Sequence, residues 1–419
     1  MLFKVATIRL LILAGFLTSP LLLAVEAKLE LSNAISLSSL ADKVYQRHPA
    51  HHNDRVQQQQ IKANSSLANA RFADAPSINL LHQNDSVGSD DGMQEWEGRI
   101  DFPLWLAGQK QQQLMLSDKM TAELPAYKQQ IRLDASAKLR DIIWNVVVAN
   151  NASTQAEQIW QTAEKLEHDV TARVNAGELA GTERLLANTH VLEMHSQYRL
   201  AQAELERALT NYQRLTGERV LPYNYEESLS ELANEHHSVA TISQQHPLLM
   251  IMAQQINTLR AKQGLAYFKG ANPPIFSIGV RSERGQRGEH FNNSVGVGVS
   301  FALDDTVYRQ PAVASAARKL VGAEITRKQL ERELNIILFS QLHDLETKQE
   351  QRELAIEKNT ITQQYLTRQQ RAFDLGEIDL VSLLRSQALA HTSENRKHAL
   401  EIDIKHMIAN VNQALGVAL

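Results

Sequence analysis

The chain contains no cysteine, and beyond its first 27 residues it has no second long apolar run. The missing thiols exclude a disulfide framework, thiolate chemistry and a lipid-acceptor cysteine, so stability must come from packing. The missing apolar runs exclude a transmembrane helix in the mature chain. A formal net charge of -4, with basic and acidic residues interspersed, excludes the basic footprint of a nucleic-acid-binding protein.

The N-terminus has the features of a secretory signal peptide. Lys4 and Arg9 precede the apolar run Leu10 to Ala24, and the small-residue site Val25-Glu26-Ala27 follows. A membrane anchor is the alternative for an apolar stretch of this length, but the basic flank and the small-residue exit favour cleavage. We therefore expect residues 1–27 to be removed and the mature protein to lie outside the cytoplasm.

The mature sequence consists of two similar halves. A shift of 199 residues superposes Phe102 on Phe301 and Leu104 on Leu303. The same shift superposes Gly177-Glu178 on Gly376-Glu377, Leu185 on Leu384, Asn211 on Asn410 and Gly217 on Gly416. We therefore predict a first repeat over 28–217, a connector over 218–238 and a second repeat over 239–419.

Each half opens with a polar helical stretch, Leu40 to Arg71 or Ser243 to Phe268, and then changes to the period-two alternation of β-strands. The predicted strands form one hairpin per half, at 76–83 with 94–102 and at 274–282 with 293–301. Alternating side chains point to opposite faces of a strand, so the apolar members share one face. Those expected on an apolar, lipid-facing surface are Trp96, Ile100, Phe102, Val295, Val297 and Val299.

A very long helical pattern follows each hairpin, at 109–176 and 311–375. About 65 residues at 1.5 Å each span roughly 100 Å, which is longer than a globular core can bury. Such helices must pack side by side as a coiled coil. Gly177 and Gly376 are expected to end them as left-handed caps, with another amphipathic helix running back from each.

Four strands cannot close a barrel, because about eight is the smallest number seen and open edges are not tolerated in lipid. Three copies of the chain would supply twelve strands, with an apolar outer band and a polar lumen. The helices that follow the strands would prolong such a barrel into a hollow cylinder. The residues therefore predict a conduit, mainly α-helical with a small β part.

The order of the motifs supports a family resemblance. A hairpin is followed by Phe102-Pro103-Leu104-Trp105 and Gly108, the helix bends read Arg173-Val-Asn-Ala-Gly177-Glu and Phe373-Asp-Leu-Gly376-Glu, and the repeats close on Leu-Thr-Gly217 and Leu-Gly416. Over essentially the whole mature chain this pattern resembles the TolC-type outer-membrane efflux proteins. The stretch Pro103-Leu-Trp-Leu-Ala-Gly-Gln109 is also similar to the CzcC-like branch, which exports heavy metals.

The resemblance implies a homotrimer in the Gram-negative outer membrane, with a helical tunnel in the periplasm. It implies two protein partners, a periplasmic adaptor (membrane fusion protein) and an inner-membrane pump of the RND type or similar, and no cofactor or catalysis in the duct itself. In the family the adaptor-docking motif surrounds the bend glycines. The matching positions are Ala176, Gly177, Glu178, Leu179, Leu375, Gly376, Glu377 and Ile378.

Members of the family often close the periplasmic end with acidic rings after the second bend, which select for cations. The matching positions in this chain are Ser382 and Arg385, so the sequence departs from the acidic pattern. Asp379, one turn after Gly376, could supply charge instead, or could pair with Arg385. These three residues are the candidates for a periplasmic gate.

Residues that could suggest other chemistry have simpler explanations. The pairs His51-His52 and His236-His237, and His246, lack HxxxH spacing or a carboxylate partner, and adjacent helical residues point about 100° apart, so we predict no metal site. No GxSxG, HExxH, paired-carboxylate or Cys/His nucleophile pattern stands out, which argues against an enzyme.

Four other interpretations account for parts of the sequence. A duct of the same fold could carry drugs, other organic compounds or secreted proteins instead of metals. A secreted coiled-coil scaffold would have no use for two apolar hairpins. A periplasmic adaptor would have one helical hairpin between Gly-rich segments rather than two full repeats, and a periplasmic enzyme lacks a site.

Overall fold

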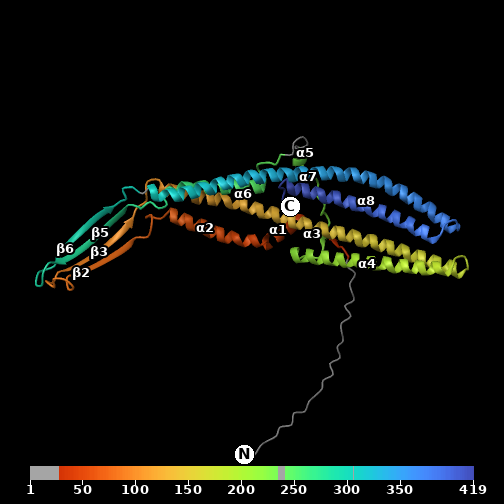
Figure 1. Ribbon diagram of the computed structural model, residues 1–419, viewed down its shortest axis with the longest axis horizontal. Helices are drawn as coiled ribbons and strands as arrows, with labels where there is room; N and C mark the ends of the chain where they lie inside the picture. Colours follow the sequence, from red (N-terminus) through yellow and green to blue (C-terminus); the bar gives the residue numbers. More distant parts are fainter. Residues whose placement is uncertain (1–27, 235–240, 305) are drawn as a thin grey trace, which may run out of the picture.

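The computed structural model describes residues 28–234, 241–304 and 306–419 (Figure 1). The expected signal peptide and the His236-His237 pair lie outside the described residues. The molecule is long and narrow, with a β-sheet at one end and long helices forming the rest (Figure 1). No helix in the described part of the chain combines the length and the apolar character needed to cross a membrane.

The first repeat runs through two short helices, a β-hairpin and two long helices. Its elements are β1 (Leu31–Ser32), α1 (Leu37–Arg47), α2 (Asn53–Ala68), β2 (Ser77–Asn84), β3 (Gln94–Pro103), α3 (Gln109–Asn175) and α4 (Gly181–Thr216). A 3-10 turn at Pro49–His52 separates α1 from α2. The strands lie within two residues of the expected bounds.

The connector carries β4 (Leu221–Pro222) and α5 (Glu231–Asn234). The second repeat then follows the order of the first, with α6 (Pro247–Ala266), β5 (Ile275–Arg284), β6 (Asn292–Ser300), α7 (Thr306–Asp374) and α8 (Leu380–Ala414). The 67 residues of α3 and the 69 residues of α7 each extend roughly 100 Å at 1.5 Å per residue.

The helices form one curved layer rather than a bundle with its own centre. Towards the free end, α7 contacts α8, α8 contacts α3 and α3 contacts α4; near the sheet, α6 lies between α3 and α7, and α2 packs on the other side of α3 (Figure 1). α3 therefore has neighbours along two sides, whereas the outer helices α4 and α7 keep one side without a partner among the described residues.

The single helical stretch expected from Leu40 to Arg71 is wrong at Pro49. Proline disfavours the α conformation in the residue before it, and His48 is accordingly extended with ψ 130°. The His48 side chain then caps the next turn, because its Nδ1 accepts a hydrogen bond from the Ala50 amide at 3.2 Å. The chain therefore bends between α1 and α2 and both helices pack against α3.

The largest apolar cluster surrounds the middle of α3. Leu139, Ile143 and Trp144 are almost fully buried there, together with Leu40 of α1 and Tyr212 of α4. The two-residue strands β1 and β4 pair in parallel beside this cluster and bring the connector to the start of the chain. The core thus lies near the middle of the long axis of the molecule, where the two repeats meet.

His246 caps α6 from a buried position. Its side chain is 2% exposed, and its Nδ1 accepts a hydrogen bond from the Leu248 amide at 3.2 Å. Burial lowers the pKa of His246, because desolvation disfavours the imidazolium. An acceptor role also requires the unprotonated nitrogen.

We expect acid to weaken the fold partly through His246. Below the unfolded-state pKa of about 6.5 the unfolded chain binds a proton that the folded chain resists, so the free energy of unfolding falls as the pH drops through and below this value. In the variant His246→Asn the cap acceptor remains without a titrating group. Between about pH 7.5 and 5.5, thermal unfolding should show that the stability of this variant falls less steeply with pH than that of the wild type. An equal dependence of stability on pH in the two proteins would contradict the role assigned to His246.

Candidate functional site

Both long helices end in the same glycine cap, at the end of the molecule farthest from the sheet. Gly177 and Gly376 have φ of 81° and 78°. The amide of Gly177 donates to the Val174 carbonyl and that of Glu178 to the Arg173 carbonyl; Gly376 and Glu377 repeat the pattern in the second half. This Schellman arrangement satisfies carbonyls that the ending helix leaves free.

The two bends, which we call the tips (residues 175–180 and 374–379), divide the predicted docking residues into two groups. Leu179 and Ile378 are half-buried and pack on a cluster built from Val170, Phe373 and Leu380. The exposed residues are Ala176, Gly177, Glu178, Leu375, Gly376 and Glu377. Leu375 is 69% exposed, which is unusual for a leucine with an apolar cluster close by.

Arg173 joins the two tips. Its Nη1 donates to the Phe373 carbonyl at 3.3 Å, its guanidinium lies over the Phe373 ring at 5.0 Å, and its Nε donates to Glu178 at 3.2 Å. Sequence reasoning quoted both residues in the bend motifs but did not select them. The position equivalent to Arg173 in the second repeat is Ala372, so the repeats are not symmetric at this contact.

The residues after the second bend begin α8. Asp379 is its N-cap, and the Oδ1 atom accepts a hydrogen bond from the Ser382 amide at 2.9 Å. Hydrogen bonds from Ser382 lower the pKa of Asp379, so its carboxylate stays charged. Arg385 is exposed and contributes favourably to that charge. Capping therefore accounts for Asp379, and a gate role for Asp379, Ser382 and Arg385 stays a prediction.

Replacing Gly177 by alanine should lower the free energy of unfolding by about 1 kcal/mol, since a Cβ in the left-handed region is strained. An added Cβ would meet nothing within 4 Å, so the loss isolates backbone strain. Gly322→Ala inside α7 also meets nothing within 4 Å and should instead stabilise by up to about 1 kcal/mol. Thermal unfolding of both variants in detergent tests this; a change of the same sign in the two would contradict it.

The four longer strands form one antiparallel sheet in the order β2-β3-β5-β6. The hairpins of the two repeats are joined by pairing of β3 with β5, where Ile100 lies opposite Ile278. The register continues this row to Ile78 in β2 and Val297 in β6. The sheet therefore has one continuous apolar face. The strands β2 and β6 at its two ends have no further partner among the described residues.

All six residues expected on an apolar face lie on this one. Sequence reasoning missed further members, namely Ile78, Leu80, Phe276, Ile278 and Val280. The alternation in Phe276, Ile278 and Val280 could have identified them, whereas Leu81 breaks the alternation in β2. Most of these side chains are exposed in the single chain.

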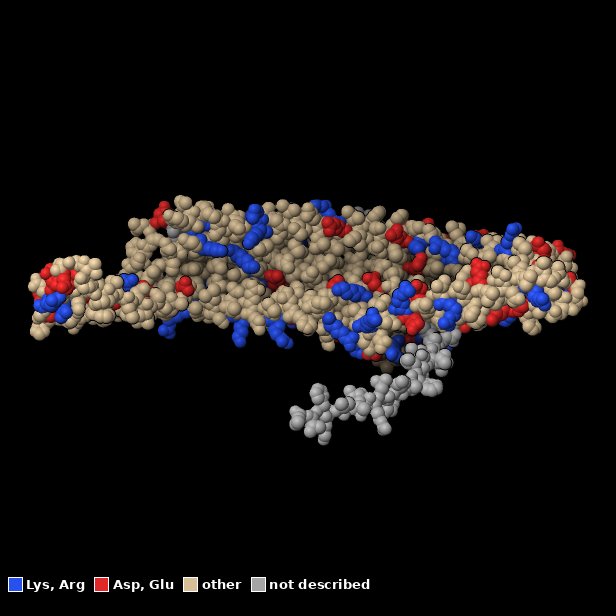
Figure 2. Space-filling view, turned by 60° about the horizontal axis from the view of Figure 1, so that its bottom comes forward, with Lys and Arg blue, Asp and Glu red and all other residues tan. Residues whose placement is uncertain are grey.

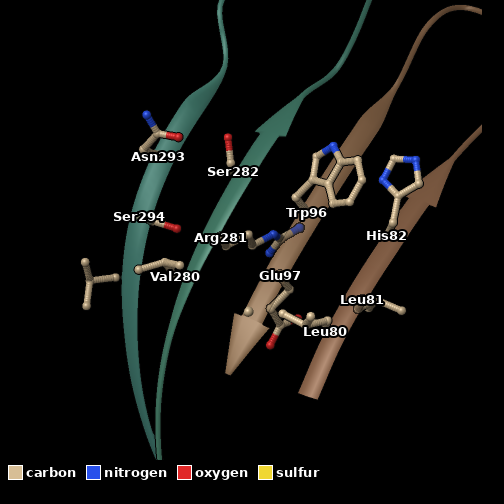
Figure 3. A pocket seen from close by; sticks show the side chains of 12 residues that line it. Leu80, Leu81, His82, Trp96, Glu97, Val280, Arg281, Ser282, Asn293 and Ser294 are labelled. Carbon is tan, nitrogen blue, oxygen red and sulfur yellow. The ribbon is translucent and has the colours of Figure 1, made fainter. Parts of the chain in front are cut away.

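A hollow of about 580 Å³ crosses all four strands near their loop ends (Figure 3). Leu80, Trp96 and Val280 line it, and Figure 3 shows His82 beside Trp96. Their rings stack with centroids 3.9 Å apart. All the residues that line this hollow belong to the four strands of this one sheet.

The opposite face of the sheet is polar. Arg281 forms ion pairs with Glu95 at 2.8 Å and with Glu283 at 2.6 Å, and Arg99 forms one with Asp101 at 3.0 Å. With Glu97 the face carries four acidic side chains against two arginines, a formal excess of two negative charges. An acidic, wet face and an apolar face thus lie back to back.

Within the described ranges, no group of three or more His, Asp or Glu is arranged to hold a metal ion. The expectation that His51 has no carboxylate partner is wrong, because its Nδ1 lies 3.6 Å from Oδ2 of Asp54, three residues later; its ring also contacts Tyr45. His246 serves as a helix cap. These contacts give the two histidines structural roles.

Comparison with known proteins rests on structure. The sequence matches no protein-family model and no curated protein. The structure is similar to the CmeC outer membrane channel of Campylobacter jejuni, with a TM-score of 0.69 and 14% identity over 91% of this chain and 85% of that one. It is similar to the outer-membrane channel OprN, with a TM-score of 0.68 and 18% identity over 91% of this chain and 90% of that one.

A third similar structure is the outer membrane protein VceC of Vibrio cholerae, with a TM-score of 0.68 and 11% identity over 91% of this chain and 96% of that one. Identities this low establish the fold alone. The expected mainly helical, TolC-like fold is thereby confirmed.

Proposed function

We propose that the protein is an outer-membrane exit duct of a tripartite efflux system in a Gram-negative bacterium, acting as a homotrimer and not as an enzyme. The observation that carries the proposal is the sheet: it is apolar on one face, polar and acidic on the other, and continuous with a long single layer of helices. A membrane conduit needs this combination, because lipid and water meet opposite faces of one wall. The fold shared with outer-membrane channels supports the same assignment.

Closure of the barrel requires other copies of the chain. The outer strands β2 and β6 present backbone groups that lipid cannot satisfy, and four strands are too few to close alone. Pairing β6 of one copy with β2 of the next joins three sheets into about twelve strands. The apolar face, including Trp96, Ile100, Phe102, Val295, Val297 and Val299, then faces lipid.

The outer helices support assembly along their whole length. On α7, Ile325, Ile336 and Leu354 are all more than half exposed, at spacings of 11 and 18 residues that place them on one side of the helix. On α4, Leu185, Leu192 and Leu200 are 64–70% exposed, about two turns apart. These two stripes border opposite sides of the layer. Packing α7 of one copy on α4 of the next covers both and closes a tunnel.

The tips are the surface for a periplasmic adaptor, which links the duct to an inner-membrane pump. They lie at the end of the molecule opposite the sheet, where Figure 2 shows Asp and Glu side chains interspersed with Lys and Arg. Leu375 adds an exposed apolar anchor beside Glu377. Asp379, Ser382 and Arg385 follow at once in α8, so a gate there would respond to adaptor contact.

We assign heavy-metal cations as the cargo, because the Pro103 to Gln109 stretch resembles the CzcC-like branch and the polar face is acidic. Asp and Glu side chains lining a pore favour cations over anions. A duct for drugs, other organic compounds or secreted proteins is the second candidate, because the fold shared with outer-membrane channels is compatible with any of these cargoes.

The architecture is tested by fractionating cell membranes and by recording conductance. The full-length protein should appear in the outer membrane as a trimer that dissociates on heating, and the purified trimer should conduct ions in planar bilayers. A monomer in the soluble periplasmic fraction would refute the duct.

The cargo is tested with a deletion strain exposed to zinc, cobalt, cadmium, copper and silver salts, and in parallel to detergents, dyes and antibiotics. Sensitivity confined to metals, reversed by the wild-type gene, is the expected result. Sensitivity to organic compounds with normal metal tolerance would exclude the metal branch while leaving the duct intact.

A further inference from the structure

A cavity of about 420 Å³ opens where the helices meet the sheet. Its walls come from the sheet-proximal ends of four helices and from Trp105, two residues after the end of β3. Most of the lining is apolar, with Trp105, Leu265 and Phe268 contributing the largest side chains. The Trp105 indole N–H donates to the Ala70 carbonyl at 3.1 Å, so one wall is held in place.

Three lysines, Lys262, Lys269 and Lys319, border this cavity. Their side chains are exposed, no Asp or Glu lines the cavity, and no carboxylate among the described residues forms an ion pair with them. Two of them extend from α6 or its C-terminal end, and Lys319 extends from α7. An apolar hollow with three uncompensated ammonium groups at its rim suits a ligand with a negative head and a hydrocarbon tail.

The position of the cavity further restricts the class of ligand that could bind in it. Figure 2 shows Lys and Arg side chains over the helices next to the sheet. Two residues that line the cavity lie next to strand ends: Trp105 is two residues after the last residue of β3, and Ala73 is four residues before the first residue of β2. With the sheet in the outer membrane, the cavity therefore lies at the headgroup level of the periplasmic leaflet.

We propose that this cavity binds an anionic phospholipid of the periplasmic leaflet, an inference that rests on the proposed outer-membrane location. The phosphate lies among the ammonium groups of Lys262, Lys269 and Lys319. The upper part of an acyl chain lies against Trp105, Leu265 and Phe268. Lysine ammoniums bind phosphate as point charges, and their stems cover the apolar wall. One such lipid per chain fixes the depth of the duct in the membrane.

The experiment measures lipid retention on the purified full-length trimer by native mass spectrometry. Phosphatidylglycerol and phosphatidylcholine with identical acyl chains are the probes. We expect the wild type to retain phosphatidylglycerol in preference to phosphatidylcholine. The triple variant Lys262→Gln, Lys269→Gln, Lys319→Gln should bind phosphatidylglycerol about a hundredfold more weakly, because each basic residue facing an anionic lipid contributes roughly a factor of five.

Two control variants separate charge at the cavity from general effects. Lys119→Gln, Lys165→Gln, Lys358→Gln removes the same charge from exposed helix positions outside the cavity and should retain lipid as the wild type does. Replacing the three cavity lysines by arginine should restore retention. Conductance of every variant in planar bilayers reports folding and assembly by a measurement separate from lipid retention.

Three results would overturn the proposal: unchanged retention in the glutamine variant, equal retention of the two lipids, or displacement of the lipid by glycerol phosphate alone. A wild-type trimer that conducts ions but retains no lipid refutes only the lipid site. A protein that forms no conducting trimer refutes the duct itself.

Discussion

Replacing Glu227 by alanine should lower the free energy of unfolding by about 3–5 kcal/mol, because it leaves a buried guanidinium without its counter-charge. Arg140 of α3 is 2% exposed. Its Nε and Nη2 atoms donate to the two carboxylate oxygens of Glu227 at 2.8 and 2.6 Å. Nη1 donates to the Gln413 side chain and to the Val417 carbonyl. The ion pair thus ties the connector and the end of α8 to α3.

The measurement is thermal unfolding of the detergent-solubilised trimer, together with trimer yield. Glu204→Ala is the control, because Glu204 pairs with Arg207 at 3.0 Å on an exposed stretch of α4, where such a pair contributes at most about 1 kcal/mol. The double variant Arg140→Met, Glu227→Leu should recover most of the loss, since no unpaired charge remains. Equal destabilisation by Glu227→Ala and Glu204→Ala would contradict the role of the buried pair.

The sequence was sufficient for features that repeat at short period. The alternation of valine and glycine in β6 and the unbroken helical pattern of α3 each specify an element locally, because side-chain periods of 2 and 3.6 reflect backbone geometry. The glycine caps at the tips could equally be predicted, since a left-handed cap strongly favours glycine.

Features that depend on distant parts of the chain could not be read in this way. Arg140 and Glu227 are 87 residues apart and belong to no periodic pattern. The pairing of β3 with β5, which turns two hairpins into one sheet, is a contact between repeats that neither hairpin specifies alone. The parallel bridge of β1 with β4 is two residues long, too short to leave a pattern.

At the candidate site, the sequence identified the glycine bends but not the contact between them. Arg173 reaches Phe373 across the tips only because α3 packs beside α8, and this packing is a property of the whole layer. Asp379 is the opposite case. Its position after the second bend suggested a gate residue, whereas a carboxylate at the start of a helix accepts a hydrogen bond from a free backbone amide in any protein.

Val297→Arg should prevent assembly of the trimer in the outer membrane. Val297 lies on the apolar face opposite Ile278, and an arginine at the middle of a lipid-facing strand costs about 2–4 kcal/mol in each copy. Gly296→Arg is the matched control, one residue away and therefore on the polar face. An added Cβ at Gly296 meets nothing within 4 Å, so the control introduces the same charge without a steric conflict at its base.

The readout is the amount of heat-dissociable trimer in the outer-membrane fraction at equal expression. We expect Val297→Arg to lose most of it and Gly296→Arg to keep it, with conductance shifted towards anions because the lumen gains positive charge. Equal loss in both variants would mean that β6 tolerates no large residue on either face. Loss confined to Gly296→Arg would reverse the two faces of the sheet, and the acidic row of Glu95, Glu97 and Glu283 would then have to meet lipid, which its charge forbids.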